Sequence, residues 1–371
     1  MHVLLATGIY PPETGGPATF VPALAAEWRA QGHTVTVVTY GDERTKRSTD
    51  WSVEVVSRAG GFALRYLRYA IRVWRLARSA DMVFLQGAFS EGLPGTIGAI
   101  LARKKTLLRV PGDFAWEGMQ REQASSITAL EAFLTTPKPL KWRIVFAIES
   151  CVARRASFVV TPSRYLQQLS TAWGVPKERQ RVIYNTVELE QQLPPRAELR
   201  ERFGLHEGQT VLLSNARGAS WKRVDFLLEV LQQLPESYRL VHIGEGPEIA
   251  VWKRKAAELG LTERVQFNGR VSYLEVQSWA RAADAFILPS LYEGFPHVAI
   301  EAACHGAPCF LSDQGGNPEA AEIYPERIRL LPYGDHRAWK QALETIPVSF
   351  PPILPEPFAT VASAYAKLLP S

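Results

Sequence analysis

Two glutamates bracket the stretch "EGFPHVAIE" at residues 293–301, and their spacing raises a question of chemistry. We expect "FILPS" (286–290) to be a strand and the residues from about Pro296 onward to be a helix, because proline lacks only an N–H that is unpaired in a first helical turn. The free N–H groups and the dipole of a helix N-terminus favour an anionic ligand. Glu293 then lies in the loop and Glu301 more than one turn into the helix. The stretch predicts an anion site with a carboxylate on either side.

Carboxylates repel a phosphate, so Glu293 and Glu301 must bind other groups, and an ionised carboxylate accepts hydrogen bonds from hydroxyl groups. A phosphate group with hydroxyl-rich groups on both sides describes a nucleotide sugar, with a ribose on one side of the diphosphate and a hexose on the other. The alternative is an ordinary loop glutamate and a solvent-exposed helix face.

A second cluster of charge follows the predicted strand "TVLLSNA" (210–216). The loop "RGASWKR" carries Arg217 and Lys222, which can clamp a diphosphate and stabilise the charge that develops on a leaving group. The alternative is two surface cations. The Gly-rich turn "IGEGPE" (243–248) adds weak support for a phosphate-binding edge.

The elements that position these residues follow a repeating pattern. Short apolar runs alternate with amphipathic stretches, which is typical of parallel α/β sheets. The predicted strands are 2–7, 34–39, 81–86, 105–110 and 157–161, then 210–216, the start of 239–248, 265–269, 284–290 and 308–312. The restart near residue 210 predicts an N-terminal domain at 1–188, a second domain at 189–355 and a C-terminal helical segment at 356–371. In such sheets ligands bind beyond the carboxyl ends of the strands.

Composition narrows the class of protein. The chain has 371 residues, which is long for one core, and only three cysteines, which favours a reducing compartment. The N-terminus lacks the basic region of a signal peptide, and no apolar run has the length of a transmembrane helix. We therefore expect a cytoplasmic protein. Basic residues exceed acidic ones in residues 1–200, but no nucleic-acid-binding signature accompanies them, so we expect no nucleic-acid partner.

Taken together, these motifs resemble the retaining glycosyltransferases of family four, which include bacterial lipid and polysaccharide glycosyltransferases. The resemblance covers nearly the whole chain and includes "GAPCFLSDQGGNPE" (306–319) and the glycine loop "ETGGPATF" (13–20). It implies the α/β fold called GT-B, in which two Rossmann-like parallel-sheet domains face a cleft and a C-terminal helix crosses back to the first domain. It also implies an N-terminal acceptor-side domain and a C-terminal donor-binding domain.

The resemblance assigns roles to individual residues of the donor site. It implies that Glu293 contacts the hydroxyls of the donor sugar, that Glu301 contacts the ribose, and that Arg217 and Lys222 hold the diphosphate. Further contacts would come from the backbone at Gly294, Phe295 and His297, and from Gly15 and Gly16 closing on the donor phosphates.

The acceptor side departs from the family pattern. The family often carries a histidine after its fourth or fifth strand, whereas here "KTLLRV" runs into "PGDFAWEG" (111–118), which contains none. Asp113 or Glu117 would occupy that space, where a carboxylate can orient the acceptor hydroxyl or stabilise positive charge on the sugar ring. The alternative is that both simply hold the loop. The triplet "NTV" (185–187) likewise stands where the family has Asn-Gly-Val.

The predicted reaction transfers a hexosyl group from a nucleoside diphosphate sugar to a hydroxyl of a saccharide or lipid-linked acceptor, with retention implied by the family. No cofactor is expected. No metal is expected either, because the chain has no Asp-x-Asp pair and His297 and His305 are too isolated to ligate one. Two alternatives stay open: a nucleotide-sugar 2-epimerase and a non-catalytic sensor of nucleotide sugars. A dehydrogenase is disfavoured, because neither first loop contains G-x-G-x-x-G followed by an acidic residue.

Residues 62–78, "FALRYLRYAIRVWRLAR", predict a basic amphipathic helix. One face carries arginines, and a second carries apolar side chains, part of which must pack on the N-terminal sheet. The basic face holds Arg65, Arg68, Arg72, Arg75 and Arg78, and the apolar face holds Leu64, Leu67, Ile71 and Trp74. Such a stripe suits an anionic membrane surface, which would place the protein at the inner face of a membrane beside a lipid-linked acceptor. The alternative is a solvent-exposed arginine face.

Overall fold

The computed structural model describes residues 1–371 except 14, 46, 123–128, 191 and 371. The chain divides into two compact units, which we describe separately. Unit 1 contains residues 1–122, 130–185 and 357–371, and unit 2 contains residues 186–356.

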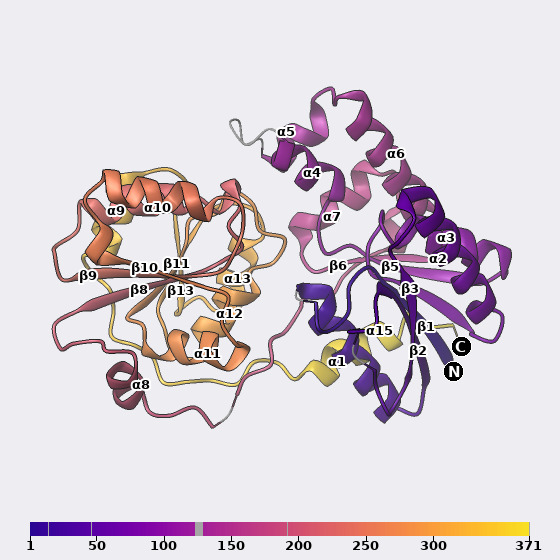
Figure 1. The fold of residues 1–371 in the computed structure, drawn as a ribbon, viewed down its shortest axis with the longest axis horizontal. Coiled ribbons are helices and arrows are strands. Elements are labelled where there is room, and N and C mark those ends of the chain that lie inside the picture. Colours follow the sequence, from indigo (N-terminus) through magenta and orange to yellow (C-terminus); the bar gives the residue numbers. More distant parts are fainter. Residues whose placement is uncertain (14, 46, 123–128, 191, 371) are drawn as a thin grey trace. The chain divides into compact units, whose positions relative to one another are not determined.

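Unit 1 is built on a seven-stranded parallel sheet in the order β3-β2-β1-β4-β5-β6-β7 (Figure 1). Its strands are β1 (His2–Thr7), β2 (Thr34–Gly41), β3 (Ser52–Ser57), β4 (Met82–Leu85), β5 (Lys105–Arg109), β6 (Phe158–Thr161) and β7 (Gln180–Val182). The order changes direction between β1 and β4. In open α/β sheets, ligands bind beyond the carboxyl ends of the strands at such a point.

Helices cover both faces of this sheet. α1 (Gly16–Ala30) and α15 (Phe358–Ala366) pack together on one face, and α2 (Gly61–Ala77), α3 (Gly92–Leu101), α6 (Leu140–Arg155) and α7 (Arg164–Ala172) form a series on the other. Two further helices, α4 (Phe114–Glu122) and α5 (Leu130–Thr135), connect β5 to α6. A short 3₁₀ turn, η1 (Lys177–Arg179), precedes β7.

The end of the chain returns to unit 1 through α15. The Trp28 indole of α1 donates to Ala362 O at 3.1 Å, and the buried Arg109 guanidinium donates to Tyr365 Oη at 3.1 Å. Arg109 also donates to Asn185 Oδ1 at 2.8 Å. These contacts join the last helix to the core around β5.

Unit 2 contains a six-stranded parallel sheet in the order β10-β9-β8-β11-β12-β13. Its strands are β8 (Thr210–Asn215), β9 (Tyr238–Ile243), β10 (Val265–Gly269), β11 (Ala285–Leu288), β12 (Cys309–Ser312) and β13 (Ile328–Leu331). Here the order changes direction between β8 and β11, so the loops that leave these two neighbouring strands meet at one edge.

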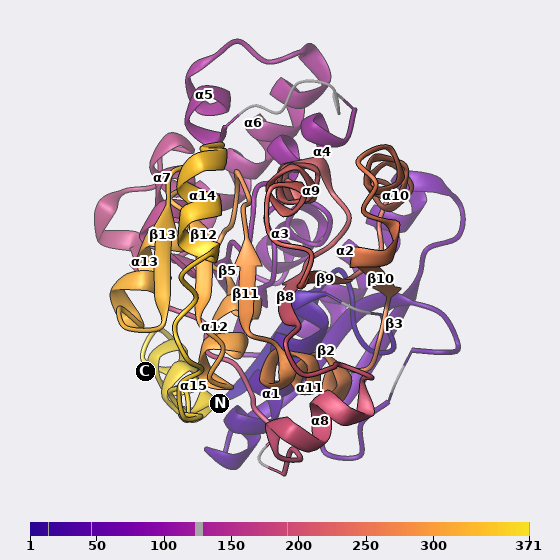
Figure 2. The same ribbon diagram turned by 90° about the vertical axis from the view of Figure 1, so that its left-hand side faces the viewer.

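The helices of unit 2 again form two layers (Figure 2). α9 (Val224–Gln232), α10 (Ile249–Glu258) and α14 (His336–Leu343) cover one face, and α8 (Arg196–Arg202), α11 (Tyr273–Ala282) and α12 (His297–Cys304) cover the other. α13 (Asn317–Ile323) packs beside β13. The short turns η2 (Ser220–Lys222) and η3 (Thr262–Arg264) precede α9 and β10.

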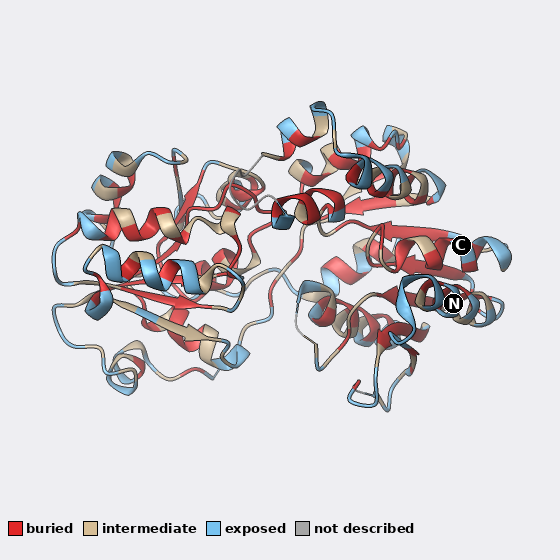
Figure 3. Cartoon of the chain, turned by 45° about the horizontal axis from the view of Figure 1, so that its top comes forward, coloured by how far each residue is buried: buried red, intermediate tan, exposed pale blue. Residues whose placement is uncertain are grey.

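Burial follows the layered design in both units (Figure 3). Strands covered on both faces read as continuous apolar runs, and β1, β4, β11 and β12 are buried throughout except for the partly exposed His2. Each unit thus has a core of its own, which fixes the strand ends and the loops that leave them.

All ten strands predicted from the sequence are present. The sequence prediction did not include β3, β7 and β13, which are edge strands of six, three and four residues. The first helix begins at Gly16 and not after the glycine loop, because Pro17 suits a first helical turn and Gly15 adopts the non-helical φ of 145° before it.

The sequence prediction chose the wrong side chains of residues 62–78 to pack on the sheet. α2 turns Tyr66, Tyr69, Ala70, Val73 and Ala77 toward the sheet. The Tyr69 hydroxyl lies 3.0 Å from both Thr7 O and Val38 O, so it reaches polar groups that a leucine could not satisfy. The side chains predicted to pack inward are left outside: Leu64, Leu67 and Ile71 are exposed. Within the described residues, no helix is both long and apolar enough to cross a bilayer.

Candidate active site

The loops after β8 and β11 meet through a buried ion pair. Leu291 N donates to Trp221 O at 2.8 Å, which fixes the two loops backbone to backbone. Beside this contact, Lys222 Nζ donates to Glu293 Oε1 at 2.6 Å, and the two side chains are only 16% and 10% exposed. A charge-assisted bond at low exposure is strong, because neither partner is well solvated without the other. The two residue positions predicted from separate motifs are therefore in direct contact.

The loop after β12 contacts the backbone of Glu293. Gly316 N donates to Glu293 O at 2.8 Å. Gly315 has a φ of 65°, and a Cβ there would lie 2.7 Å from Glu293 N and 2.8 Å from Glu293 O. Only glycine fits both the backbone conformation and this close approach. The two glycines of "SDQGGNPE" thus pack closely against the backbone of Glu293 and hold its loop in place.

Glu301 is the fifth residue of α12 and is 8% exposed. The Tyr273 hydroxyl of α11 lies 2.6 Å from Glu301 Oε1 and 2.8 Å from Glu188 O. Burial raises the pKa of Glu301 to about 7, against the smaller opposing effect of the Tyr273 bond. This carboxyl group therefore changes charge near neutral pH.

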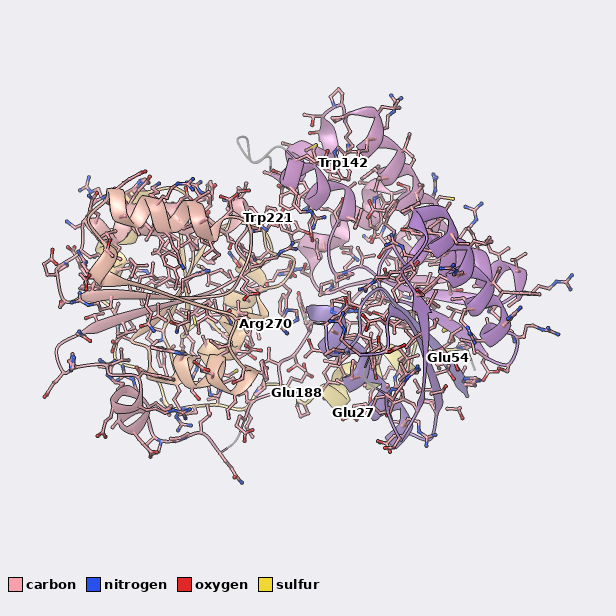
Figure 4. The ribbon with its side chains drawn as sticks, in the orientation of Figure 1. Glu27, Glu54, Trp142, Glu188, Trp221 and Arg270 are labelled. Carbon is pink, nitrogen blue, oxygen red and sulfur yellow. The ribbon has the colours of Figure 1, made fainter. Side chains whose placement is uncertain are left out.

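The segment that enters unit 2 packs on α11 and helps to hold this carboxyl group. Gln277 Nε2 donates to Glu188 O at 3.1 Å, and Glu190 N donates to Gln277 Oε1 at 2.7 Å. Figure 4 labels Glu188 on this segment. His305 Nε2 lies 2.9 Å from the same Gln277 Oε1, and burial lowers the pKa of His305 to about 4. His305 is thus an uncharged part of the scaffold.

The N-terminus of α12 lies between the two glutamates along the chain. Pro296 occupies the position directly before the first helical residue, His297, and not the first turn itself. Proline offers no side-chain acceptor, so it leaves the N-terminal N–H groups of α12 without a cap from this position. Gly294 is half-buried and Phe295 is buried.

The loops after β8 and β9 run against each other through glycines. Gly218 N donates to Glu245 O at 2.9 Å, and a Cβ on Gly246 would lie 2.4 Å from Gly218 O. Next to this contact, a surface hollow of about 330 Å³ is lined by Gly244, Glu245, Gly246, Ile249, Lys253, Phe267, Asn268 and Gly269. Arg217 is exposed on the same loop. Figure 4 shows Trp221 and Arg270, which follow β8 and β10, on one side of unit 2.

In unit 1, the predicted glycines begin α1. Gly15 precedes the helix without a side-chain cap, and the space next to Gly16 on its Cβ side is open. Nearby in the chain, Arg58 binds Glu13 through two hydrogen bonds of 2.6 and 2.8 Å and also donates to Gly8 O at 3.0 Å. The loop after β1 is thereby tied to the segment after β3.

Asp113 is completely buried. The sequence did not indicate this burial. Its Oδ1 accepts from Trp116 N at 2.7 Å and its backbone carbonyl accepts from Glu117 N at 3.0 Å, so Asp113 caps the N-terminus of α4. Glu149 of α6 is also buried, and it accepts from Phe114 N at 3.1 Å. One carboxyl group directly before α4 and one on α6 therefore hold the same helix start.

Burial raises the pKa of Asp113 to about 7, against the opposing effect of the hydrogen bond from Trp116 N, and the charge of Glu117 adds to the rise. Burial and the charge of Asp113 raise the pKa of Glu149 well above its usual range. Asp113 Oδ2 and Glu149 Oε2 have no hydrogen-bond partner among the described residues. Glu117 is less buried, and its side chain lies 3.9 Å from the Arg121 guanidinium.

A third buried carboxyl group lies where the strand order of unit 1 changes direction. Glu91, in the loop after β4, is 5% exposed and accepts a hydrogen bond from Ser90 Oγ. A Cβ on Gly8 or on Gly87 would lie 2.7 Å from a Glu91 carboxylate oxygen. Two glycines thus make room for one carboxylate, whose pKa is raised by burial.

Two family models match the chain in succession. A model described as "Glycosyl transferase 4-like domain" matches residues 15–186, and one described as "Glycosyl transferases group 1" matches residues 195–346. The chain is a family-four glycosyltransferase of the GT-B fold.

Named relatives agree with this assignment. The glycosyltransferase is 26% identical over 363 residues to the alpha-monoglucosyldiacylglycerol synthase of Streptococcus pneumoniae, covering 93% of this chain and 78% of the relative. Among solved structures, it is similar to Anabaena HepE in complex with UDP and glucose, with a TM-score of 0.75 and 20% identity, covering 99% of this chain and 94% of the other. Sucrose-phosphate synthase from Thermosynechococcus elongatus has a TM-score of 0.75 and 18% identity, with 92% and 88% covered.

Sequence reasoning missed three residues of this glycosyltransferase that the structure brings forward. Tyr273 is the exposed first residue of α11, and its sequence neighbours carry no sign of a partner 28 residues away. Glu149 and Glu91 are buried. The only sign of this in the sequence is a single glutamate among apolar neighbours, which is rarely buried without a partner. Among the described residues, no three His, Cys, Asp or Glu side chains are placed to hold a metal ion.

Proposed function

We propose that this enzyme transfers a hexosyl group from a nucleoside diphosphate sugar to a hydroxyl group of an acceptor. The observation that carries the proposal is the ion pair between Lys222 and Glu293, which lies on the loop that leads into α12. This edge of unit 2 combines a cation, a helix dipole and a carboxylate, which are the groups that a diphosphate joined to a sugar requires.

For the donor, we assign Lys222 and Arg217 to the diphosphate and Glu293 to the sugar hydroxyls. In the structure, Lys222 and Glu293 pair with each other. A bound donor would supply an anion to Lys222 and hydroxyl donors to Glu293. Each side chain would then exchange its present partner for a group of the donor. The backbone at Gly294, Phe295 and His297 would line the sugar and the phosphates.

For the nucleoside, we assign Glu301 to the ribose. The solved structures of HepE that resemble this chain contain UDP or UDP-glucose, which supports a uridine nucleotide as the first donor to test. The glucosyl group in the name of the pneumococcal relative supports the same sugar.

In unit 1, which we assign to the acceptor, Gly15 and Gly16 at the start of α1 would bind a phosphate of the donor through backbone N–H groups. Asp113 is buried under the start of α4, so we assign it to the orientation of this helix and Glu117 to contact with the acceptor. A lipid-linked saccharide or a polysaccharide precursor fits the lipid product in the name of the pneumococcal relative.

We propose that transfer retains the anomeric configuration. The bond from the anomeric carbon to the phosphate oxygen breaks as the bond to the acceptor oxygen forms on the same face, and the acceptor proton passes to the leaving phosphate. Lys222, Arg217 and the α12 dipole would stabilise the charge that develops on this phosphate. The route uses no resident cofactor. The three free thiols, two of them buried, support a cytoplasmic location.

A panel of UDP-, GDP- and dTDP-sugars with wild-type enzyme tests the proposal. We expect one donor class to raise the melting temperature and to release nucleotide when an acceptor is supplied. Stabilisation by a donor with no turnover for any saccharide or lipid acceptor would identify a sensor instead. Conversion of the donor sugar to its C2 epimer would identify an epimerase.

A further inference from the structure

Helix α3 of unit 1 buries its small side chains and exposes its large apolar ones. Its sequence GLPGTIGAIL contains no charged residue, and it turns its small side chains inward: Gly92, Pro94, Gly95, Thr96, Gly98 and Ala99 are buried. Its large side chains point outward, with Ile97, Ile100 and Leu101 exposed by 44, 53 and 61%. A helix that covers a core normally does the opposite.

Helix α2 continues this exposed apolar surface. Gly98 of α3 approaches Ala70 O and Trp74 N of α2 so closely that a Cβ on it would lie 2.7 and 2.8 Å from these atoms. Leu67 and Ile71 lie beside Trp74 on the same side of α2 by helical spacing, and both are exposed. Figure 1 shows α2 and α3 side by side on one face of the unit 1 sheet.

A rim of positive charge accompanies these side chains. Arg68 and Arg75 of α2 and Arg78, directly after it, are exposed, and Arg103 and Lys105 follow α3. Arg72 does not belong to the rim, because it pairs with Glu54 of β3, which Figure 4 labels, at 3.2 Å. Arg65 is half-buried over the rings of Tyr40 and Tyr66. Residues 55–80 and 92–112 contain no aspartate or glutamate, so no acidic group of these segments offsets the rim.

We propose that this docking face, formed by Leu64, Leu67, Ile71, Ile97, Ile100 and Leu101 with Arg68, Arg75 and Arg78 at its margin, binds an anionic lipid bilayer surface. An apolar strip that enters the boundary of headgroups and acyl chains, edged by cations that meet lipid phosphates, is how interfacial helices bind. Exposed apolar patches of this kind mark interaction sites in water-exposed proteins.

A second copy of the chain is a poorer occupant of the docking face. In a two-fold symmetric dimer the same surface meets itself, so the three arginines of one copy would approach those of the other. Like charges at such a contact oppose association. An anionic bilayer offers the opposite charge over the whole rim.

Flotation of the full-length enzyme with phosphatidylcholine vesicles, with and without phosphatidylglycerol, tests the proposal. Wild type should float with anionic vesicles at about 50 mM salt and dissociate toward about 500 mM. Changing Arg68, Arg75 and Arg78 to serine should weaken partitioning about 100-fold, from the contribution of each basic residue near such a surface. Changing Leu67, Ile71 and Ile100 to serine should weaken it comparably at low salt.

Matched controls separate the docking face from general charge and apolar content. Arg29, Arg254 and Arg337 are exposed on other elements, and so are Val251, Ile323 and Val348. Serine at either set should leave flotation unchanged. Nucleotide release with a water-soluble acceptor should be the same in all variants, so a failure of docking is distinguishable from a failure of the proposed reaction.

Two results would overturn the proposal. One is wild-type enzyme that ignores anionic vesicles at low salt. The other is a docking-face variant that floats as well as wild type. A concentration-dependent dimer that the Leu67, Ile71 and Ile100 variant abolishes, without any vesicle binding, would instead assign the face to a second copy of the chain.

Discussion

Lys222 Nζ lies 2.6 Å from Glu293 Oε1, across two loops that are 71 residues apart in the sequence. The pair is largely buried, so removing either partner leaves an uncompensated charge. A cation and a carboxylate are therefore in contact at the edge of unit 2 where we propose that the donor binds. A nucleotide sugar can then recruit each of them by exchange of partners.

Lys222→Ala and Arg217→Ala should each lower turnover by about 10²-fold or more, because under the proposed function each removes a charge that stabilises the leaving phosphate. Steady-state rates of nucleotide release measure the effect. Lys340→Ala, an exposed lysine of α14 paired with Glu344, is the control and should keep full activity. If both variants retain wild-type turnover, the donor-site assignment is wrong.

Gly315→Ala should disturb the Glu293 loop. The new Cβ would lie 2.7 Å from Glu293 N, and the φ of 65° is strained for alanine. Gly204→Ala has nearly the same φ, 66°, but meets nothing within 4 Å, so it reproduces the backbone strain without the clash. We expect a large rise in the donor KM for Gly315→Ala only. Equal KM values in the two variants would show that the close approach to Glu293 is unimportant.

The sequence predicted the inner strands, because strands buried on both faces leave continuous apolar runs. It also predicted that Glu293 lies in a loop and Glu301 in a helix, as the structure has them. It missed the edge strands β3, β7 and β13, whose short, mixed sequences carry a weak pattern. It also reversed the faces of α2. Helical spacing allows either a leucine stripe or a tyrosine stripe to face the sheet, and the hydrogen bonds of Tyr69 to the strands decide between them.

Contacts between residues far apart in the chain could not be predicted from a single sequence. Nothing near Asp113 in the chain signals that Glu149, 36 residues later, holds the same helix start, and nothing near Glu301 signals Tyr273. Such contacts depend on how α4 packs on α6 and α11 packs on α12, which local propensity does not encode. The electrostatic character of both carboxyl groups follows from these contacts and not from residue type.

UDP affinity should depend on the ionisation of Glu301. A ribose hydroxyl donates best to the ionised carboxylate, and burial raises the pKa of Glu301 to about 7. Affinity should therefore increase as pH rises from about 6 to about 8, by up to about tenfold from this group. Titration calorimetry of wild type and Glu301→Gln measures it, and the variant corrects for protonation of UDP itself. The same pH dependence in both proteins would exclude Glu301 as the source.

Glu301→Ala should mainly weaken donor binding, since a ribose contact is made equally in the ground state and the transition state. The donor KM should rise while kcat stays close to wild type. Glu27→Ala in α1 is a matched control, because this partly exposed glutamate lies outside the proposed donor site. An unchanged donor KM in Glu301→Ala would count against the ribose assignment.

Asp113→Asn should reduce turnover without reducing donor affinity. Asparagine keeps an oxygen that can accept from Trp116 N, so α4 stays capped, but the carboxyl group that interacts with Glu149 is lost. Nucleotide release and UDP calorimetry on one preparation separate the two effects. Parallel loss of folded protein and of activity would show instead that Asp113 only holds the loop.

The Asp113–Glu149 pair should also make stability depend on pH. Both carboxyl groups have folded pKa values above their ordinary ones, about 7 for Asp113, so the folded protein binds more protons than the unfolded chain between pH 4 and 7. By linkage, the free energy of unfolding then falls as pH rises through this window. Glu149→Gln keeps an acceptor for Phe114 N and removes one titrating group, so it should flatten the decline. Denaturant unfolding of wild type and Glu149→Gln at about pH 5 and about pH 8 measures the difference. A decline that is as steep in Glu149→Gln as in wild type would mean that other groups cause it, because loss of Glu149 removes one titrating carboxyl group and changes the titration of the group that interacts with it.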